Sequence, residues 1–215
     1  MYAKFWKRFF DFTLSLLALI VLSPVLLVLI IVGAIAMRGN PFFVQPRPGR
    51  KGKDGREKIF YLIKLRSMSN KRGTNGELLP DDQRLGRYGA FLRSTSLDEL
   101  PSLVNIVLGQ LSIVGPRPLL VAYLPRYSAR QRRRHEVRPG LTGYAQAYGR
   151  NLLTWGEKFE KDVYYVDNLS FWLDVKIVFK TISVVLKREG ITSGTSVTME
   201  EFMGIEKEMK VINHE

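Results

Sequence analysis

The sequence predicts a mostly helical α/β protein in which a re-entrant membrane helix-break-helix precedes one compact, cytoplasm-facing domain. Three patterns support this class: an almost wholly apolar segment at 12–37, two short apolar runs around a basic, turn-rich stretch at 42–63, and an amphipathic pattern at 171–189. The compact domain should therefore contain a small β-hairpin and interfacial amphipathic helices. The expected boundaries are 1–38 for the membrane anchor, 39–191 for the compact domain and 192–215 for a C-terminal tail.

The apolar segment is long enough to cross a membrane, but its middle is interrupted. Its roughly 26 residues would extend about 39 Å as a straight helix, against a hydrocarbon core of about 30 Å. Pro24 cannot donate the helical hydrogen bond to the Ile20 carbonyl, although the Ser23 hydroxyl can bond back to that turn. We expect a break at Ser23–Pro24 into two helices of roughly 11 and 13 residues, each too short to span alone.

Positive charge flanks both ends of this segment. Because Lys and Arg favour the cytoplasmic side, both flanks satisfy that bias only when the segment dips in and turns back. A proline-kinked spanning helix stays open as an alternative. A signal peptide is a weaker one, since the apolar stretch exceeds the usual length although Ala34–Ala36 resembles a cleavage site. The flanking cations are Lys4, Lys7 and Arg8 before the segment, and Arg38, Arg47, Arg50, Lys51 and Lys53 after it.

The later elements follow from turn residues and apolar spacing. Phe42–Val44 and Ile59–Ile63 are apolar runs separated by basic, Pro- and Gly-rich residues, which predicts a hairpin with a cationic loop. The last long helix has three lysines on one face, so it packs as core with a lysine edge or lies in the membrane interface. Helices are expected at 85–93, 101–108, 155–168 and 171–189, a basic helix or loop at 125–135, a C-cap at Gly190, and a weak capping box at Thr198–Glu201.

Composition excludes several kinds of chemistry. The chain has no cysteine, which removes disulfides, thiolate nucleophiles and cysteine zinc sites, and its two histidines, His135 and His214, exclude a multi-histidine metal site. Thirty-three Lys and Arg against 20 Asp and Glu give a net charge of +13. Such an excess attracts anionic lipid, phosphorylated substrates or nucleic acid, but no nucleic-acid-binding motif is present.

Adjacent carboxylates at Asp98 and Glu99 have two interpretations. Ser96-x-x-Glu99 is a capping box, and an acidic pair at a helix start complements the helix dipole. Alternatively, Asp98 is a nucleophile that attacks phosphorus while both carboxylates hold a divalent metal, for which phosphate and carboxylate oxygens favour Mg²⁺. Arginines fixed by neighbouring prolines and glycines could offset the negative charge, as in the turns around Arg117, Arg138 and Arg150.

Taken together, these residues resemble the small monotopic phosphoglycosyl transferases, the bacterial initiating sugar transferases, and look closest to small members that work in protein glycosylation. The similarity runs in order from about residue 5 to 191. The matching motifs are Ser23-Pro24, Lys64-Leu65-Arg66-Ser67-Met68, Leu92-Arg93-Ser94-Thr95-Ser96-Leu97-Asp98-Glu99-Leu100-Pro101, Val114-Gly115-Pro116-Arg117-Pro118-Leu119, Arg138-Pro139-Gly140-Leu141-Thr142-Gly143, Gly149-Arg150-Asn151 and Phe171-Trp172-Leu173-Asp174.

The resemblance implies a catalytic domain held at the cytoplasmic face of the bacterial inner membrane, among its phospholipids. Asp98 would attack the β-phosphorus of a UDP-sugar, release UMP, and pass the phosphosugar to undecaprenyl phosphate, with Glu99 assisting through Mg²⁺ or as a base. The sugar would be an N-acetylated amino or diamino sugar, and later glycosyltransferases of the pathway would be partners. Substrate-binding roles would fall to Lys64, Arg66, Arg93, Arg117, Arg138 and Arg150, and to Asp167 unless it is an ordinary helix-surface carboxylate.

Two further hypotheses compete with this enzyme. One is a membrane-anchored basic binding or scaffold protein for anionic lipid without catalysis, which would not need Asp98. The other is metal-assisted phosphate hydrolysis, which would proceed without a lipid acceptor.

Overall fold

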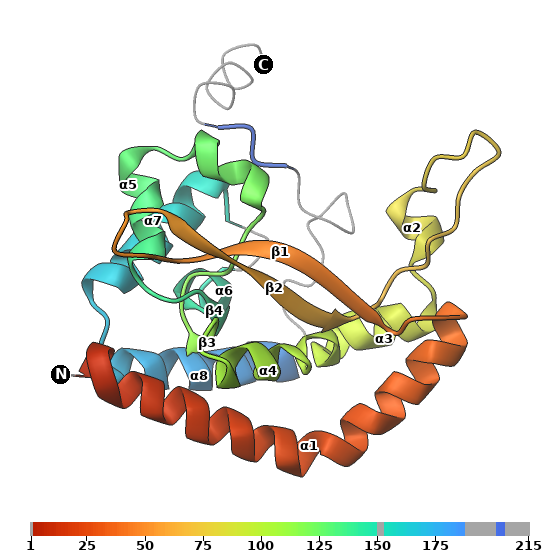
Figure 1. Ribbon diagram of the computed structural model, residues 1–215, viewed down its shortest axis with the longest axis horizontal. Helices are drawn as coiled ribbons and strands as arrows, with labels where there is room; N and C mark the ends of the chain where they lie inside the picture. Colours follow the sequence, from red (N-terminus) through yellow and green to blue (C-terminus); the bar gives the residue numbers. More distant parts are fainter. Residues whose placement is uncertain (1, 150–152, 188–200, 205–215) are drawn as a thin grey trace.

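The computed structural model describes residues 2–149, 153–187 and 201–204, and it has the mostly helical α/β architecture expected from the sequence (Figure 1). The strands form two small sheets, an antiparallel β1–β2 hairpin and a parallel β3–β4 pair. The elements are η1 (Tyr2–Trp6), α1 (Lys7–Met37), β1 (Phe42–Lys51), β2 (Glu57–Leu65), α2 (Asp81–Arg84), α3 (Arg87–Thr95), η2 (Leu97–Glu99), α4 (Ser102–Val107), β3 (Ser112–Val114), η3 (Val121–Arg126), α5 (Ala129–Arg132), η4 (Arg133–Glu136), β4 (Gly140–Thr142), α6 (Tyr144–Ala147), α7 (Trp155–Asp167) and α8 (Phe171–Leu186).

The apolar segment is one continuous helix that bends near its middle (Figure 1). The expected break into two separate helices is therefore wrong, although Pro24 lies inside α1 as the sequence requires. The Ser23 hydroxyl donates to the Ile20 carbonyl at 2.8 Å, which confirms the expected compensation. Because Pro24 removes only one hydrogen bond of the helix, the helix bends but does not end.

The first turns of α1 are anchored to the compact domain by a buried ion pair. The Lys7 ammonium lies 2.6 Å from Asp174 at the start of α8, and both side chains are under 10% exposed. The other oxygen of Asp174 accepts a hydrogen bond from the Tyr165 hydroxyl, and the Tyr2 hydroxyl donates to the oxygen that Lys7 binds. Lys7 is thus part of the protein interior, whereas its place before the apolar segment predicted a flanking charge that sets topology.

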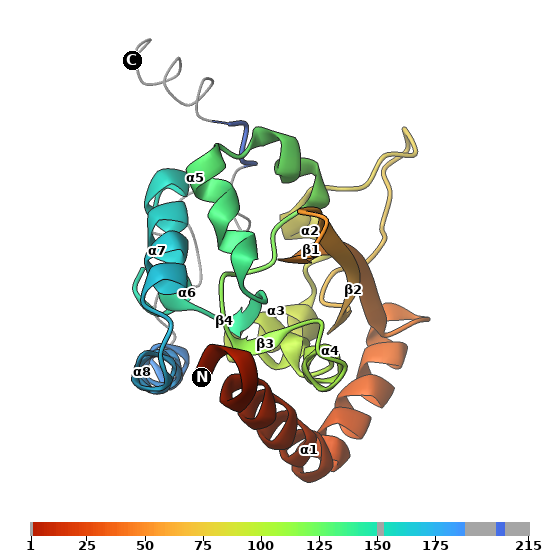
Figure 2. The same ribbon diagram turned by 60° about the vertical axis from the view of Figure 1, so that its left-hand side comes forward.

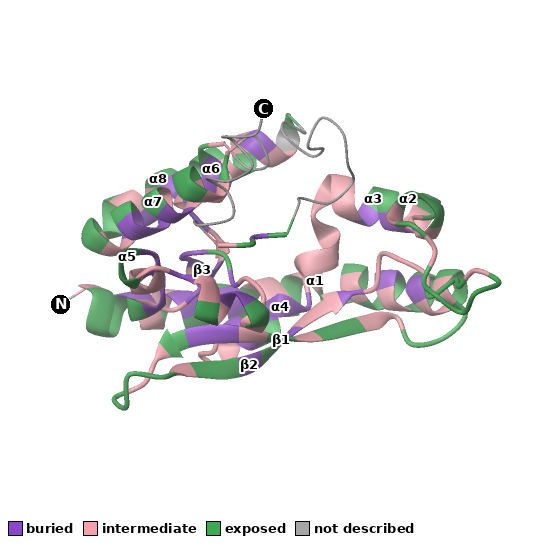
Figure 3. Cartoon of the chain, turned by 90° about the horizontal axis from the view of Figure 1, so that it is seen from above, coloured by how far each residue is buried: buried purple, intermediate pink, exposed green. Residues whose placement is uncertain are grey.

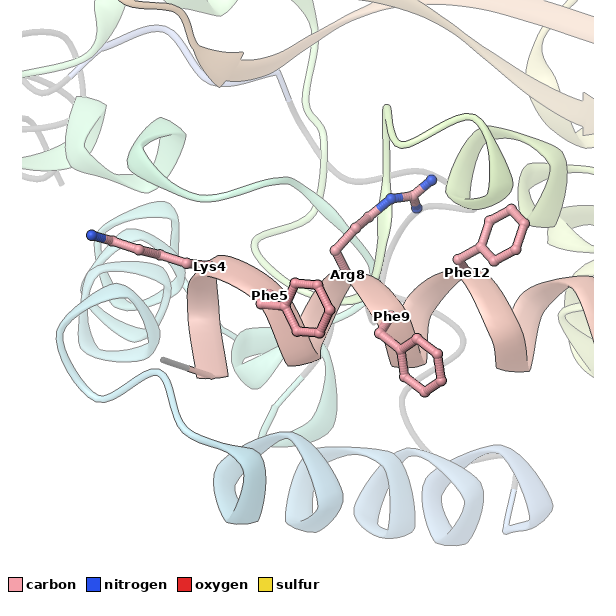
Figure 4. A pocket seen from close by; sticks show the side chains of 5 residues that line it. All are labelled: Lys4, Phe5, Arg8, Phe9 and Phe12. Carbon is pink, nitrogen blue, oxygen red and sulfur yellow. The ribbon is translucent and has the colours of Figure 1, made fainter.

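The next residues of α1 also bind backbone groups of the domain. Arg8 donates to the carbonyls of the last two residues of α4, and its side chain points toward the domain in Figure 4. The Asp11 carboxylate, 3% exposed, accepts from the Ser112 hydroxyl and from the Ile113 backbone amide, at the start of β3. Both contacts satisfy backbone or hydroxyl groups that would otherwise be buried without partners.

The second half of α1 contacts the same domain. The Tyr88 hydroxyl of α3 donates to the Leu29 carbonyl, and Leu29 packs in a cluster with Leu65 and Leu92. Gly33 lies against the Tyr88 ring, where a side chain would collide with the hydroxyl. Both halves of α1 therefore lie along one side of the domain, on either side of the bend (Figure 2).

Large apolar side chains of α1 and α8 are exposed to solvent. Figure 3 colours each residue of the chain by its burial, with exposed residues in green. Trp172 and Phe179 of α8 are 71% and 69% exposed, and Ile35 of α1 is 72% exposed. At the start of α1, three exposed rings line an open hollow with Lys4 and Arg8 (Figure 4). By length and composition, residues Tyr2–Met37 could cross a membrane. A water-exposed apolar surface of this extent indicates a membrane anchor.

The domain core confirms most of the expected elements. The hairpin is longer than its apolar runs, because the basic residues between them continue both strands. Helices α3, α4, α7 and α8 lie within a few residues of their expected ranges. Two capping boxes, Ser128–Gln131 and Thr154–Glu157, start α5 and α7. Both have the sequence pattern of a capping box, but the analysis of the sequence did not identify them.

Residues 201–204 pack against the domain. Phe202 is fully buried in an aromatic cluster with Tyr123, Tyr127 and Phe159. Arg126 binds both the Glu201 carboxylate and the Phe202 carbonyl. The domain boundary at 191 stays a prediction; the expected Gly190 cap and the start of the Thr198–Glu201 box lie outside the described residues.

Candidate active site

Asp98 and Glu99 lie on η2, a single 3₁₀ turn between α3 and α4. Ser96 precedes it with φ 59° and ψ 18°, a left-handed conformation that ends α3 and redirects the chain. Ser96 makes no side-chain cap, and the Glu99 carboxylate turns to other partners. The capping-box interpretation of Ser96 and Glu99 is therefore wrong.

Two buried polar residues of α4 fix this turn against the hairpin. The Ser102 hydroxyl donates to the Ile63 carbonyl, and the Asn105 side chain accepts from the Ile63 amide and donates to the Tyr61 carbonyl. Both side chains are at most 1% exposed. Because Ile63 directly precedes Lys64, these bonds set the position of Lys64 relative to Glu99.

Glu99 binds two cations through a single oxygen. Lys64 Nζ lies 2.5 Å and Arg117 Nη2 2.8 Å from Glu99 Oε1. Burial raises the pKa of Glu99, but the charges of Arg117 and Lys64 outweigh this effect and bring that pKa to about 2. Neither cation binds Oε2. Glu99 therefore stays ionised and retains one oxygen for another ligand.

Asp98 differs from its neighbour because it has no hydrogen bond or ion pair to any residue in the described part of the chain. Burial and the adjacent Glu99 charge raise the pKa of Asp98, while Lys64, Arg117 and Arg93 oppose that shift. The pKa of Asp98 is thus raised, whereas the pKa of Glu99 is lowered. Such a divergence is typical of a reactive pair in which one group is held ionised and the other is basic and free to react.

Arg117 is positioned by close packing between two glycine-containing turns. A side chain on Gly115, Gly140 or Gly143 would collide with backbone atoms of the opposite turn, so only glycine permits this approach. Arg134, 2% exposed and paired with Asp162, donates to the Arg117 carbonyl. The buried Arg134–Asp162 pair therefore holds the backbone from which Arg117 reaches Glu99.

Two other predicted site residues, Arg93 and Arg138, bind groups other than the Asp98 and Glu99 carboxylates. Arg93 is close enough to lower the pKa of Asp98, but its guanidinium binds Ser67 and Met68. Arg138 donates to the Gly109 carbonyl, and its pKa is lowered by burial and then by Arg50 and Arg8, near the start of α1.

Three predicted residues remain. Asp167 pairs with Arg133 at 2.5 Å on the surface of α7 and is 45% exposed, as the helix-surface alternative expects. The Arg66 backbone amide bonds to the Pro41 carbonyl, while its side chain has no hydrogen bond or ion pair among the described residues. Arg150 lies outside the described residues.

Asp98 and Glu99 offer the donor set that Mg²⁺ prefers with a phosphorylated ligand. Mg²⁺ typically takes one or two carboxylates, substrate phosphates and water. The free Asp98 carboxylate and the uncommitted Glu99 Oε2 fit this pattern. Within residues 2–149, 153–187 and 201–204, no group of three or more His, Asp or Glu side chains forms a metal site from protein ligands alone.

The residues that hold this site in place have little signal in the sequence. Ser102 and Asn105 follow Pro101 in a mostly apolar stretch. Polar residues in such a stretch are the sequence signal that could have indicated their structural role. Arg134 lies in the basic run Arg132–His135, and nothing in that run distinguishes this buried arginine from Arg132 and Arg133, which are only partly buried.

The chain is similar to a described protein family and to relatives whose names state an activity. The family described as bacterial sugar transferase matches residues 2–188. The chain is 48% identical over 198 residues to an uncharacterised sugar transferase of Bacillus subtilis, EpsL, with 92% of this chain and 96% of that protein covered.

Two longer relatives have names that state a reaction. The chain is 36% identical to the undecaprenyl-phosphate galactose phosphotransferase of Salmonella typhimurium, with 87% of this chain covered. It is 39% identical to the UDP-glucose:undecaprenyl-phosphate glucose-1-phosphate transferase of Klebsiella pneumoniae, with 82% covered. The chain spans only 42% and 39% of the lengths of these two proteins.

Proposed function

Because the chain belongs to the bacterial sugar transferase family, we propose that it transfers a phosphosugar from a UDP-sugar to undecaprenyl phosphate. The observation that carries this proposal is Asp98, which has no partner among the described residues, beside a Glu99 that two cations hold ionised. A free carboxylate next to bound cations suits nucleophilic attack on phosphorus.

In the first step, an Asp98 oxygen forms a bond to the sugar-bearing phosphorus. The bond between that phosphorus and the bridging oxygen breaks, and its electron pair leaves with UMP. In the second step, an oxygen of undecaprenyl phosphate attacks the same phosphorus, the bond to Asp98 breaks, and the carboxylate is restored. The product is a sugar linked to the lipid through a diphosphate.

Lys64 and Arg117 offset the charge that this attack brings together. A pair of like unit charges at 4 Å costs about 4 kcal/mol at an effective dielectric constant near 20. The two cations lie within 2.8 Å of Glu99, at the end of the site where the phosphates must approach. Their role is to bind and orient phosphate oxygens while Asp98 attacks.

We propose that Asp98 and Glu99 also hold Mg²⁺, which when bound would neutralise phosphate charge. A carboxylate with a pKa of about 2 is a weak base, so the low pKa of Glu99 favours the metal role over general-base catalysis. Undecaprenyl phosphate needs no strong base because phosphate monoesters are largely ionised at pH 7.

We propose that α1 is re-entrant, with the catalytic domain on the cytoplasmic face of the inner membrane. Contacts of the same domain with both halves of α1 support this topology, because a spanning helix would separate Lys7 from Asp174. The chain lacks cysteine, so single cysteines at Lys4 and Arg56 can be labelled selectively. Labelling of residue 4 only from the periplasm and of residue 56 only from the cytoplasm would contradict re-entry.

The sugar that we propose is an N-acetylated amino or diamino sugar, and the product would begin glycoprotein or other glycoconjugate assembly. Motif resemblance to the small protein-glycosylation members supports this choice, whereas the two longer relatives are named for galactose and glucose. A panel of UDP-sugars therefore needs to include UDP-glucose and UDP-galactose beside the acetylated sugars.

The deciding experiment measures UMP release by purified protein with Mg²⁺, undecaprenyl phosphate and that panel. We expect repeated turnover to require both substrates and to be lost in Asp98→Asn, while the UDP-sugar alone releases at most one UMP per enzyme. The matched control is Asp82→Asn, which changes an exposed aspartate of α2 and should retain activity. Equal release from Asp98→Asn would remove the nucleophile role, and no UMP from any sugar would favour a lipid-binding or scaffold protein. Repeated turnover of UMP without the lipid acceptor would favour hydrolysis.

A further inference from the structure

Arg47 is an arginine near the site that neither the motifs nor the mechanism uses. It lies in β1 between Pro46 and Pro48, opposite Phe60 of β2. Its Nη2 donates to the Gln45 side chain at 2.5 Å. Its Nε is buried and has no hydrogen-bond partner among the described residues. An unpaired buried donor is costly, which makes this guanidinium unusual.

The surroundings of Arg47 are cationic and aromatic. Strand β1 packs against η3, which carries Tyr123. Burial, followed by the charge of Arg117, lowers the pKa of Arg47 to about 10, and Tyr123, Tyr127 and Glu99 oppose that shift only in part. Arg47 and Arg117 are therefore close enough to affect each other, and only Arg117 is bound to Glu99.

Neighbouring arginines of the same face are paired differently. Each of several arginines in η3, α5 and η4 has its own carboxylate, whereas Arg47 has no ion pair in the described part of the chain. The paired arginines are Arg126 with Glu201, Arg130 with Glu160, Arg132 with Glu57, Arg133 with Asp167 and Arg134 with Asp162. Arg47 is thus a partly buried positive charge without an anionic partner among the residues that the structure describes.

We propose that Arg47 binds the nucleotide phosphate of the UDP-sugar, the phosphate that leaves as UMP. This inference rests on the proposed function and adds a substrate-binding residue to it. A guanidinium binds phosphate through two parallel hydrogen bonds, and the unpaired Nε can supply one of them.

The order of groups across the site assigns Arg47 to that phosphate. Arg47 is opposite Phe60, and Lys64 follows Phe60 by four residues in β2, so Arg47 and Lys64 project from the same face of the hairpin. Arg117, whose charge acts on Arg47, binds Glu99 beside Asp98 together with Lys64. When the sugar-bearing phosphorus is at Asp98, the second phosphate of the substrate extends past Arg117 toward Arg47.

This position also bears on the bond that breaks. During attack by Asp98, the bridging oxygen takes the electron pair of the breaking bond and becomes part of the UMP phosphate. The negative charge that develops there lies on the Arg47 side of the reacting phosphorus. Arg47 therefore acts on substrate binding and on departure of the nucleotide, without contacting the nucleophile.

The test compares full-length wild type, Arg47→Gln and Arg56→Gln for binding of UDP, UMP and inorganic phosphate with Mg²⁺. Arg56 is an exposed arginine of the same hairpin, so its variant removes the same charge elsewhere. We expect Arg47→Gln to weaken UDP and UMP binding about 10- to 100-fold, the range of a charge-assisted hydrogen bond. Arg56→Gln should change binding by no more than about twofold.

The Tm separates a binding role of Arg47 from a structural one. Because no described carboxylate pairs with Arg47, a binding role predicts that Arg47→Gln leaves the Tm of the ligand-free protein unchanged or raises it, while the Tm increase caused by UDP shrinks. Arg47→Lys should restore part of the UDP affinity, since it keeps the charge but loses the planar fork. A lower ligand-free Tm in Arg47→Gln, without rescue of UDP binding by Arg47→Lys, would overturn the proposal.

Failure of this inference can be told apart from failure of the proposed function. Wild-type protein that releases UMP, together with an Arg47→Gln variant that binds UDP as tightly, would reject the role of Arg47 and leave the transferase intact. Wild-type protein that neither binds UDP nor releases UMP would reject both.

Discussion

Replacing Lys7 with methionine should strongly destabilise the protein, although Lys7 lies far from the reacting groups. The substitution leaves the Asp174 carboxylate, 9% exposed, with only the two tyrosine hydroxyls as partners. Breaking a buried pair by removing one member costs about 3–5 kcal/mol. In a chain of this size, about 2–4 °C of Tm corresponds to each kcal/mol, so we expect a decrease of about 6–20 °C.

The assay is thermal unfolding of the detergent-solubilised protein, with Lys4→Met as the matched control. Lys4 is an exposed lysine one helical turn earlier, and its replacement should change the Tm by no more than about 2 °C. The double variant Lys7→Met/Asp174→Leu should recover part of the loss, because it removes the unpaired charge. A Tm decrease in Lys7→Met no larger than in Lys4→Met would refute the buried anchoring of α1.

Four further outcomes test the site and the anchor. Asp98→Asn should raise the Tm at pH 7, because burial and Glu99 raise the Asp98 pKa and so make its ionised form unfavourable. Glu99 has a lowered pKa, so its contribution to stability is present above about pH 4.5 and lost as pH falls toward about 2; Glu99→Gln should flatten that acid limb in a Tm-versus-pH series. Asn105→Ala should cost about 2–3 kcal/mol in denaturant unfolding and lower kcat, since it leaves backbone groups of β2 unpaired. Pro24→Ala should straighten α1 and shift cysteine labelling of residue 4 toward the periplasm.

Local sequence patterns predicted most elements, because those elements depend on neighbouring residues. Apolar periodicity located α7 and α8, and turn residues located the hairpin. The hydrogen bond from Ser23 to the Ile20 carbonyl was predicted correctly. The effect of Pro24 was overestimated, because the helix bends there and does not break. The boundary between a kink and a break depends on packing against the domain, which no local pattern contains.

Long-range pairing is the part that the sequence did not reveal. Lys64 and Arg117 were predicted as site residues, and the structure brings both to Glu99. By contrast, Lys7 was interpreted as a charge that sets topology, although it pairs with a residue 167 positions away. A lysine beside an apolar segment has the same local pattern in both roles.

That separation has a consequence for how the chain is made. The anchor leaves the ribosome before the residues that bind it, because Ser112 and Asp174, the partners of Asp11 and Lys7, are synthesised much later. At about 5–20 residues per second, 167 residues take roughly 8–33 s. During that interval Lys7 cannot form its final contact, and Asp11 lacks its own for roughly the first 5–20 s, the time needed for 101 residues. The orientation of the apolar segment should therefore become fixed late, when α8 emerges and the newly made domain binds the beginning of its own chain.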